Sequence, residues 1–428
     1  MDLARRCYIN GALSRFACGL VVVLALALPA AAQEHRAEES SGTAWQPAAT
    51  PMTNIHAAVG DWMFMGDANV FAQFLYESGG IHRTSQQAGS INWFMGMLRR
   101  PVGRGRVGLR AMLSAEPWTI AGCGYPDLLA TGEICDGDSI HDLQHPHDLF
   151  MELAVDYDRP IADGLRLHAY AGLAGEPALG PPAFPHRGSA MPNPIAPIAH
   201  HWLDATHIAF GVVTAGVSGS RWRAEASAFN GREPDDQRAG LELGALDSLA
   251  GRVSVSPSDR WSLQVSAGHL REAEAGLGSQ PRQDVDRATA SAIYYRPTSG
   301  AGGWAGTIAW GVNHETSAIP GGELTQATHA VLAETSLRTP SGRHQWFGRL
   351  EVVGKPAHDL HVHEYITEIF TVGKLQLGFL QQLSPIKGWA PGFGAHVNLS
   401  LLPELLAPRY NGRVAPGFGL YFNLQPAP

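Results

Sequence analysis

Histidines and carboxylates gather in two stretches of this chain, and together they could bind a metal ion. The candidate ligands are His141, His145, His147, Asp148, His186, His200, His201 and Asp204. Imidazole nitrogens combined with a carboxylate suit Cu(II) or Zn(II). His207 extends the second stretch. A further run of histidines and carboxylates, from His358 to Glu364, is explained as well by the polarity of a solvated loop as by metal binding. The structural alternative is that these groups hydrogen-bond a rigid pair of loops stiffened by Pro177, Pro181, Pro182 and Pro185.

Two serine and histidine pairs could suggest a hydrolase that acts on membrane lipid. Ser266 and His269 are three residues apart, so in a strand they point to opposite faces. Ser400 and His396 would share a face but lie about 13 Å apart along a strand. The chain contains no nucleophile elbow, Gly-rich phosphate loop or zincin helix. We therefore predict no catalytic residue and keep a lipid-modifying enzyme as the third functional hypothesis.

The elements that must position these residues are β-strands. From about residue 55, stretches with alternating apolar and polar side chains are joined in turn by tight turns, such as 159–164 and 339–342, and by long connections, such as 115–148 and 315–327. Strict alternation of short and long joints is typical of an antiparallel barrel in an outer membrane. Eight long and seven short joints predict an all-β transmembrane barrel of sixteen strands over residues 55–428, with fourteen strands as the alternative count. A soluble sandwich or propeller is the competing fold.

One face of each predicted strand is apolar and the other carries charges, so the charged face should line a lumen. The side chains predicted to line it are Arg110, Glu152, Asp156, Arg166, Arg223, Glu225, Arg349, Glu351 and Lys374. Their mixed signs favour small polar or charged solutes over a strongly selective anion pore. Tryptophans that follow the tight turns predict an aromatic girdle at the periplasmic interface. They are Trp222, Trp261, Trp304, Trp346 and Trp389.

The first residues are typical of an exported protein. Arg5, Arg6 and Arg15 precede an apolar run over 16–28, and small residues follow as far as Ala32. This pattern predicts a secretory signal peptide over 1–32 that is cleaved after Ala32. An uncleaved anchor is the alternative, but about 13 apolar residues are too few to cross a bilayer comfortably. Residues 33–54, rich in Glu, Ser and Pro, are predicted to be a disordered periplasmic lead-in, too short for a plug domain.

Cleavage at that position would leave two cysteines, Cys123 and Cys135, in one long connection. In an oxidising compartment they are expected to form a disulfide that closes a short loop. A metal-binding thiol pair is the alternative.

Composition narrows the function further. The chain has 428 residues, a formal net charge of −8 and 45% hydrophobic residues. An acidic chain gives no reason to expect nucleic acid as a partner. No segment after the signal peptide has the apolar length of a membrane helix, so membrane embedding requires a barrel. The expected partners are outer-membrane lipid, the barrel-insertion machinery and small polar solutes, and the oligomeric state is left open.

Several segments resemble a family of uncharacterised proteobacterial outer-membrane β-barrel proteins. They read HPHDLFMELA (145–154), GEPALGPPAF (175–184), HHWLD (200–204) and GREPD (231–235), with 206–216 as a fifth. Members of this family occur beside copper-resistance genes, so the resemblance implies a link to copper and no assigned activity. The stretch 419–424 resembles the C-terminal insertion signal of outer-membrane barrels, although this chain continues with Gln425-Pro426-Ala427-Pro428.

These observations predict an outer-membrane pore or loop-gated channel for small polar or charged solutes, which needs no cofactor. The alternative is an envelope protein that binds or handles copper through its loop histidines, with Cu or Zn as its metal.

Overall fold

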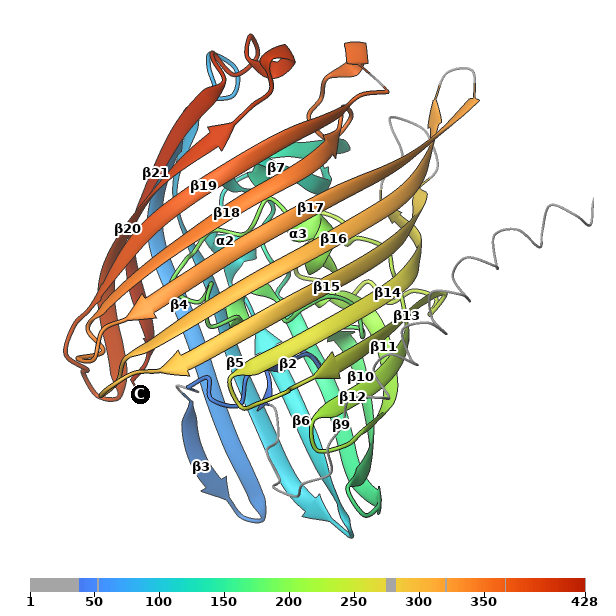
Figure 1. The fold of residues 1–428 in the computed structure, drawn as a ribbon, viewed down its shortest axis with the longest axis vertical. Helices are drawn as coiled ribbons and strands as arrows, with labels where there is room; N and C mark the ends of the chain where they lie inside the picture. Colours follow the sequence, from blue (N-terminus) through green and yellow to red (C-terminus); the bar gives the residue numbers. More distant parts are fainter. Residues whose placement is uncertain (1–37, 52–53, 275–281, 320–321, 366, 428) are drawn as a thin grey trace, which may run out of the picture. The chain divides into compact units, whose positions relative to one another are not determined.

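The computed structural model describes residues 38–51, 54–274, 282–319, 322–365 and 367–427, and the predicted signal peptide lies outside them. Sixteen antiparallel strands close into one barrel (Figure 1), which confirms the predicted fold class and strand number. The wall runs in sequence order through β4 (Trp62–Glu77), β5 (Ser85–Val102), β6 (Gly105–Leu113), β9 (Phe150–Ala162), β10 (Leu165–Gly175), β11 (Ala209–Ser218), β12 (Trp222–Phe229), β13 (Ser248–Val255), β14 (Trp261–Glu274), β15 (Gln283–Pro297), β16 (Gly303–Ile319), β17 (Gly322–Arg338), β18 (His344–Pro356), β19 (Ile369–Gln382), β20 (Trp389–Leu401) and β21 (Val414–Pro426). Pairing of β21 with β4 closes the circuit.

The joints between strands alternate between long and short, with one exception. β16 and β17 remain paired as far as Ile319 and Gly322, so the predicted long connection over 315–327 is wrong. The polar residues that suggested a loop there instead extend a strand pair. A short extra strand, β3 (Ile55–Val59), pairs with the beginning of β4. The short helical turns η3 (His363–Tyr365) and η4 (Glu404–Leu406) lie in two of the long connections.

The outer face of the barrel is apolar. Leu109, Val155 and Leu350 are 43%, 42% and 47% exposed, whereas Arg110 and Arg349, their neighbours in sequence, are buried inside. Side chains alternate between the two faces of a strand, so a shift of one residue would place these charges against lipid. A closed antiparallel barrel with an apolar outer face is the form of outer-membrane proteins.

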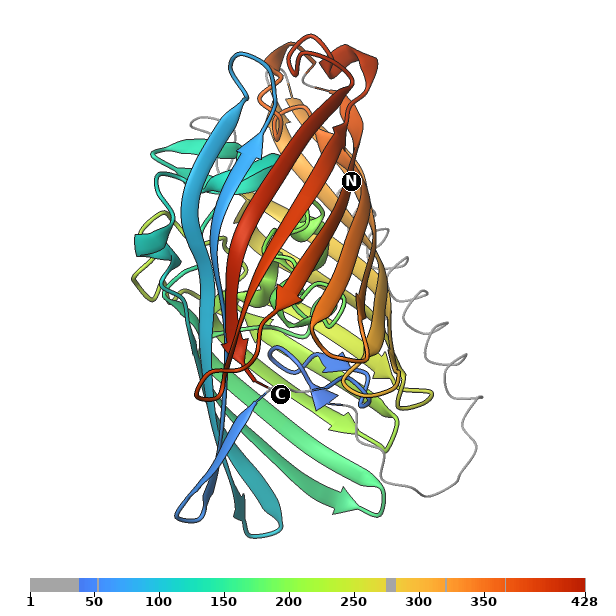
Figure 2. The same cartoon turned by 90° about the vertical axis from the view of Figure 1, so that its left-hand side faces the viewer.

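Segments of the same chain fill the interior of the barrel, and Figures 1 and 2 show the green segment that contains residues 176–208 behind the wall strands. We call residues 38–51 the N-terminal segment, which includes β1 (Glu38–Glu39) and β2 (Trp45–Gln46). The hairpin loop, residues 114–149, contains α2 (Glu116–Thr119), β7 (Tyr125–Cys135) and β8 (Asp138–Gln144). The plug loop, residues 176–208, contains η1 (Phe184–His186), α3 (His200–Leu203) and η2 (Ala205–His207). No helix among the described residues is long and apolar enough to cross a membrane.

The prediction of a disordered lead-in over 33–54 is wrong for residues 38–51, which are mostly buried. The wall supplies the polar partners that this segment needs. Arg110 donates a hydrogen bond to the Gly42 carbonyl at 2.7 Å, and Arg223 donates one to the Thr43 carbonyl at 3.0 Å. Charged groups of the barrel therefore hold a segment whose own composition is too polar to form a hydrophobic core.

The hairpin loop and the plug loop pack into an apolar core with the inner face of the wall. Leu128 of β7 and Trp202 of α3 belong to one buried cluster with Leu332 of β17. The Trp202 indole donates a hydrogen bond to Thr328 at 2.8 Å. Gly311 of β16 permits this close approach, because a Cβ there would lie 2.2 Å from the Trp202 carbonyl oxygen.

Candidate functional site

A buried ionic network joins the plug loop to the barrel wall. The side chain of Arg187 is fully buried, with Nε 2.6 Å from Glu334 Oε1 on β17 and Nη1 2.7 Å from Asp204 Oδ2 in the plug loop. Arg349 on β18 donates to the other oxygen of Glu334 at 3.2 Å and to the Ile195 carbonyl at 2.7 Å. Burial opposes ionisation of Asp204, but the adjacent guanidinium of Arg187 outweighs it and holds the pKa of Asp204 below its usual range. The network therefore consists of paired ions and spans wall and plug.

The residues predicted to line the lumen lie inside the barrel, and several of them hold the inner segments. Seven are buried: Arg110, Glu152, Arg223, Glu225, Arg349, Glu351 and Lys374. Glu351 accepts a hydrogen bond from the Ala199 N–H at the start of α3 at 3.0 Å, and Lys374 donates to the Leu128 carbonyl at 3.2 Å. These side chains are therefore anchor points for protein segments, and their contact with solute stays a prediction.

Asp156 and Arg166, the other two predicted lumen residues, are half-buried. Arg166 forms an ion pair with Asp158 of the same hairpin. Neither partner belongs to the plug loop, so this pair can serve as a control for the network around Arg187.

The N-terminal segment carries its own ionic anchor, Glu39. Its carboxylate lies 2.9 Å from Arg223 and 3.1 Å from Arg99. Burial raises the pKa of Glu39, but the guanidinium groups of Arg223, Arg99 and Arg110 together lower it well below the usual range. Glu39 is therefore charged when the segment is in place.

Five histidines cluster where the hairpin loop meets the plug loop: His147, His200, His201 and His207, which are buried, and His145, which is partly buried. Ring centroids of neighbouring members are 5.1 Å apart for His200 and His207, 5.4 Å for His147 and His207, and 5.6 Å for His200 and His201. The His145 ring lies 6.1 Å from those of both His200 and His201. Four of these belong to the predicted metal set, which omits His207.

Each of these five rings has one nitrogen close to an oxygen. The pairs are His147 Nδ1 with Glu116 Oε1 at 2.8 Å, His200 Nδ1 with Asp204 Oδ1 at 2.8 Å, His207 Nδ1 with the Asp204 carbonyl at 2.8 Å, His201 Nδ1 with Glu233 Oε1 at 3.0 Å, and His145 Nε2 with Glu133 Oε1 at 3.1 Å. Metal-binding imidazoles are commonly oriented in this way, with the second nitrogen on the ion. Nε2 of His201 and Nε2 of His207 are buried without a hydrogen-bond partner among the described residues.

The protonation of the cluster follows from its burial. Burial lowers the pKa of His145, His200 and His207, so these rings are neutral near pH 7. His147 differs, because the Glu116 carboxylate outweighs burial and raises its pKa. A neutral imidazole can use its free nitrogen as a metal ligand.

The four remaining predicted metal ligands have other contacts. His141 stacks on His361 with ring centroids 3.9 Å apart, and the His186 ring lies 4.7 Å from that of Trp93. Burial raises the pKa of Asp148 to about 8, although Arg238 lies 3.6 Å away. Both oxygens of Asp204 are engaged, one by Arg187 and one by His200. The eight predicted ligands therefore do not form one site.

A tighter set of potential ligands includes two residues that the sequence analysis missed. One ligand atom each from His201, Glu233 and Glu274 lies within 4.8 Å of the others. Glu233 belongs to the GREPD motif, which could have indicated it, whereas Glu274 at the end of β14 carries no comparable pattern. A second such group, Cys123, Cys135 and Asp136, contains two cysteines that are bonded to each other.

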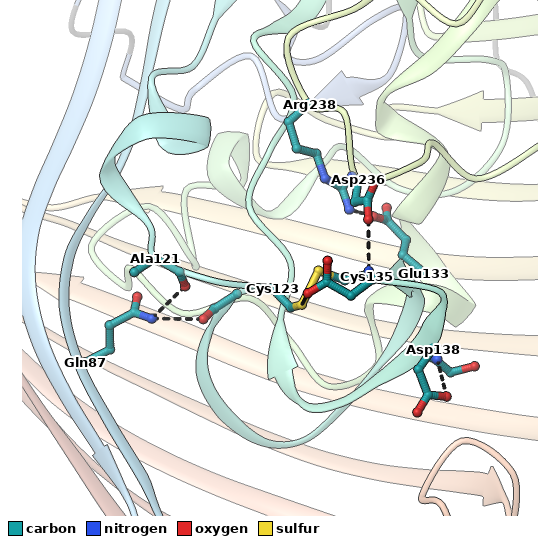
Figure 3. The surroundings of a disulfide bond; sticks show 11 residues. Gln87, Ala121, Cys123, Glu133, Cys135, Asp138, Asp236 and Arg238 are labelled. Carbon is teal, nitrogen blue, oxygen red and sulfur yellow. Dashed lines mark hydrogen bonds and ion pairs between the residues drawn. A yellow bond between two sulfur atoms is a disulfide. The ribbon is translucent and has the colours of Figure 1, made fainter.

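Cys123, which precedes β7, and Cys135, the last residue of β7, form a disulfide (Figure 3). Next to it, the Asp136 N–H donates a hydrogen bond to Asp236 at 2.9 Å, and Gln87 of β5 donates one to the Ala121 carbonyl at 3.0 Å. The disulfide therefore lies where the hairpin loop is tied to the wall and to a neighbouring loop.

The serine and the histidine of each candidate pair have different surroundings. Ser266 Oγ faces the interior and accepts a hydrogen bond from the Gly180 N–H at 2.8 Å, whereas half-exposed His269 contacts Asp286. Ser400 and His396 are both buried, and His396 Nδ1 lies 3.1 Å from the Gln376 amide nitrogen. In the part of the chain that the structure describes, neither serine contacts its histidine.

Comparison with known proteins gives structural likenesses only. No family model and no curated protein matches the chain. The fold is similar to an anion-selective porin from Comamonas acidovorans, with 13% identity, a TM-score of 0.46, and 85% of this chain and 99% of that one covered. It is also similar to the outer-membrane channel DcaP of Acinetobacter baumannii, with 10% identity, a TM-score of 0.48, and 87% and 100% covered. For OmpF of Salmonella typhi in complex with daunomycin the identity is 8%, the TM-score 0.49, and the coverage 86% and 100%. The function must therefore be argued from this chain's own residues.

Proposed function

We propose that this protein is an outer-membrane channel for small polar or charged solutes and that its plug loop is the gate. The observation that carries the proposal is the buried network in which Arg187 and Asp204 of the plug loop meet Glu334 and Arg349 of the wall. In a permanently open porin, water would hydrate such wall charges. Here a protein segment neutralises them and occupies the path.

The plug loop can move without breaking the barrel, because it contributes no strand to the wall. The wall strands are hydrogen-bonded to one another around the full circuit. Side-chain contacts join plug and wall. Ser189 lies 2.7 Å from Thr307, and Asn193 donates to Gln376 at 2.6 Å. Water can replace each of these polar contacts when the loop leaves the lumen. The proposed cycle therefore exchanges these polar protein contacts for water and also uncovers the apolar core that Trp202 shares with Leu332.

The exposed wall would then determine the solute. Arg349, Glu334 and Glu351 carry both signs of charge at neighbouring inner positions. A pore lined by both signs favours small hydrophilic solutes without strong selection for one charge. The signal-like first 32 residues support delivery to the outer membrane through the secretory pathway.

Recording from the purified protein in a planar lipid bilayer tests this function. We expect a closed baseline interrupted by openings whose frequency depends on the applied voltage. A steady open conductance from the moment of insertion would contradict gating. Complete silence in protein whose insertion is verified by heat-modifiable gel migration would contradict a channel.

A second candidate function is the binding of a divalent transition metal, in line with the resemblance to proteins encoded beside copper-resistance genes. The convergence of His201, Glu233 and Glu274 favours it. One imidazole and two carboxylates suit Zn(II) or Cu(II). We expect Glu233→Gln to weaken Zn(II) binding by about tenfold or more. Glu242→Gln in the same loop should leave it unchanged, and equal losses in both variants would argue against this site.

A further inference from the structure

A small cavity lies inside the barrel between the N-terminal segment, the plug loop and the wall. Its volume is about 20 Å³, which is room for one water-sized occupant or one metal ion. The potential ligands on its surface are Met95, Met112, Met151, His186, His207, Glu152 and Glu176. The three methionines that line this cavity also belong to a buried apolar cluster with Trp93 and Phe210.

The strand register brings the three methionines together. Met95 of β5 lies directly opposite Met112 of β6, and such pairs have Cβ atoms about 5 Å apart. Met112 in turn lies opposite Glu152 of β9, where the pairing register shifts between Met112 and Leu113. At this irregularity both Met151 and Glu152 are buried, with 1% and 5% exposed. A bulge can re-aim a side chain in this way, so the wall itself positions the third sulfur.

The plug loop contributes His207 and Glu176 to the lining of the cavity. His207 Nδ1 is occupied by the Asp204 carbonyl, while Nε2 is buried without a hydrogen-bond partner among the described residues. Oε1 of Glu176 lies 3.5 Å from Arg252. Buried polar atoms normally have partners. The cavity therefore presents an imidazole lone pair that an ion could satisfy.

We propose that this cavity binds a soft monovalent metal ion, Cu(I), through the sulfurs of Met95, Met112 and Met151 and through Nε2 of His207. Thioether sulfur is a soft, neutral ligand that selects Cu(I) over ions that prefer oxygen. The site is complete with the plug loop in place, so the inference does not depend on gating. It also differs in ligand type from the set formed by His201, Glu233 and Glu274.

The test uses Ag(I), a soft monovalent ion that does not change oxidation state under these conditions. The full-length mature protein is refolded in detergent with Ag(I), desalted and analysed for bound metal, and affinities are measured by titration calorimetry. We expect one Ag(I) per chain in the wild type. Met95→Leu and Met112→Leu should each weaken binding by about tenfold or more, and the double variant should retain none. Leucine replaces methionine with little change in volume, so the barrel should survive.

Met97→Leu is the matched control. Met97 lies two residues from Met95 on the same strand and packs in the same buried cluster, but it does not line the cavity. Its replacement should change Ag(I) affinity less than twofold, and Glu233→Gln should have no effect. The proposal is overturned if the wild type retains no Ag(I), or if Met97→Leu weakens binding as much as Met95→Leu. It is also overturned if Glu233→Gln abolishes binding while Met112→Leu does not.

Discussion

Replacing Arg187 with alanine should open the channel, because this side chain holds the plug loop on the wall. In the closed state Arg187 contacts Glu334 and Asp204, and all three side chains are at most 1% exposed. The substitution removes both ion pairs at once and leaves the strands of the wall untouched. The substitution therefore destabilises the closed state and leaves the free energy of the open barrel unchanged.

The size of the effect follows from the partners that remain. Removing one partner of a buried ion pair destabilises the folded arrangement by about 3–5 kcal/mol, because the other charge stays buried without its partner. Glu334 keeps Arg349, and Asp204 keeps His200, so we expect the lower end of that range. A loss of about 3 kcal/mol raises the ratio of open to closed channels by roughly two orders of magnitude.

Single-channel recording measures that ratio directly as open probability. Arg166→Ala is the control, because Arg166 and Asp158 are 28% and 19% exposed and neither belongs to the plug loop. Exposed pairs contribute about 1 kcal/mol at most, and the open probability should stay at the wild-type value. If Arg187→Ala gates like the wild type, or if Arg166→Ala opens the channel equally, the network around Arg187 does not hold the gate.

Further predictions concern assembly, docking and export. Leu350→Arg puts a charge on the lipid face at a cost of about 2–4 kcal/mol, so less protein should show heat-modifiable migration, and normal assembly would contradict the strand register. The pKa of Glu39 is held below its ordinary 4.5, so its carboxylate still binds the N-terminal segment to the wall as pH falls through 4.5. This contribution disappears only at more acidic pH. Limited proteolysis should therefore spare the N-terminal segment equally at pH 7 and pH 4 in the wild type, but cleave it at both in Glu39→Gln. N-terminal sequencing of protein from the membrane should begin at Gln33, and a retained Met1 would refute cleavage.

The barrel could be predicted because its signals are local. Side-chain alternation and the spacing of turns depend on neighbouring residues, and together they gave the correct strand number and faces. The filled interior could not be predicted in this way. Residues 38–51 are polar and become ordered through partners such as Arg110 and Arg223, which are distant in sequence. Inner-facing Met95 and Leu332 are examples of an available signal, because apolar side chains on the lumen face indicate that protein covers them.

The histidine cluster was predictable in outline and not in detail. Spacing alone placed His145, His147, His200 and His201 in adjoining long loops. The partners that fix their rings come from other parts of these loops and from a third loop, which have no periodic pattern that would reveal their contacts. Glu233 is an example, since it reaches His201 only because two long loops meet inside the barrel.

The claim that the plug loop is the gate is tested most directly by locking that loop to the wall. Ser189 Oγ of the plug loop and Thr307 Oγ1 of β16 are 2.7 Å apart, close enough for a disulfide in the variant S189C/T307C. With the cross-link verified by thiol quantification, the oxidised variant should pass no current in a planar bilayer, and a reductant should restore voltage-dependent openings. The same reductant should leave wild-type openings unchanged. Equal currents through the oxidised and the reduced variant would contradict a gate formed by the plug loop.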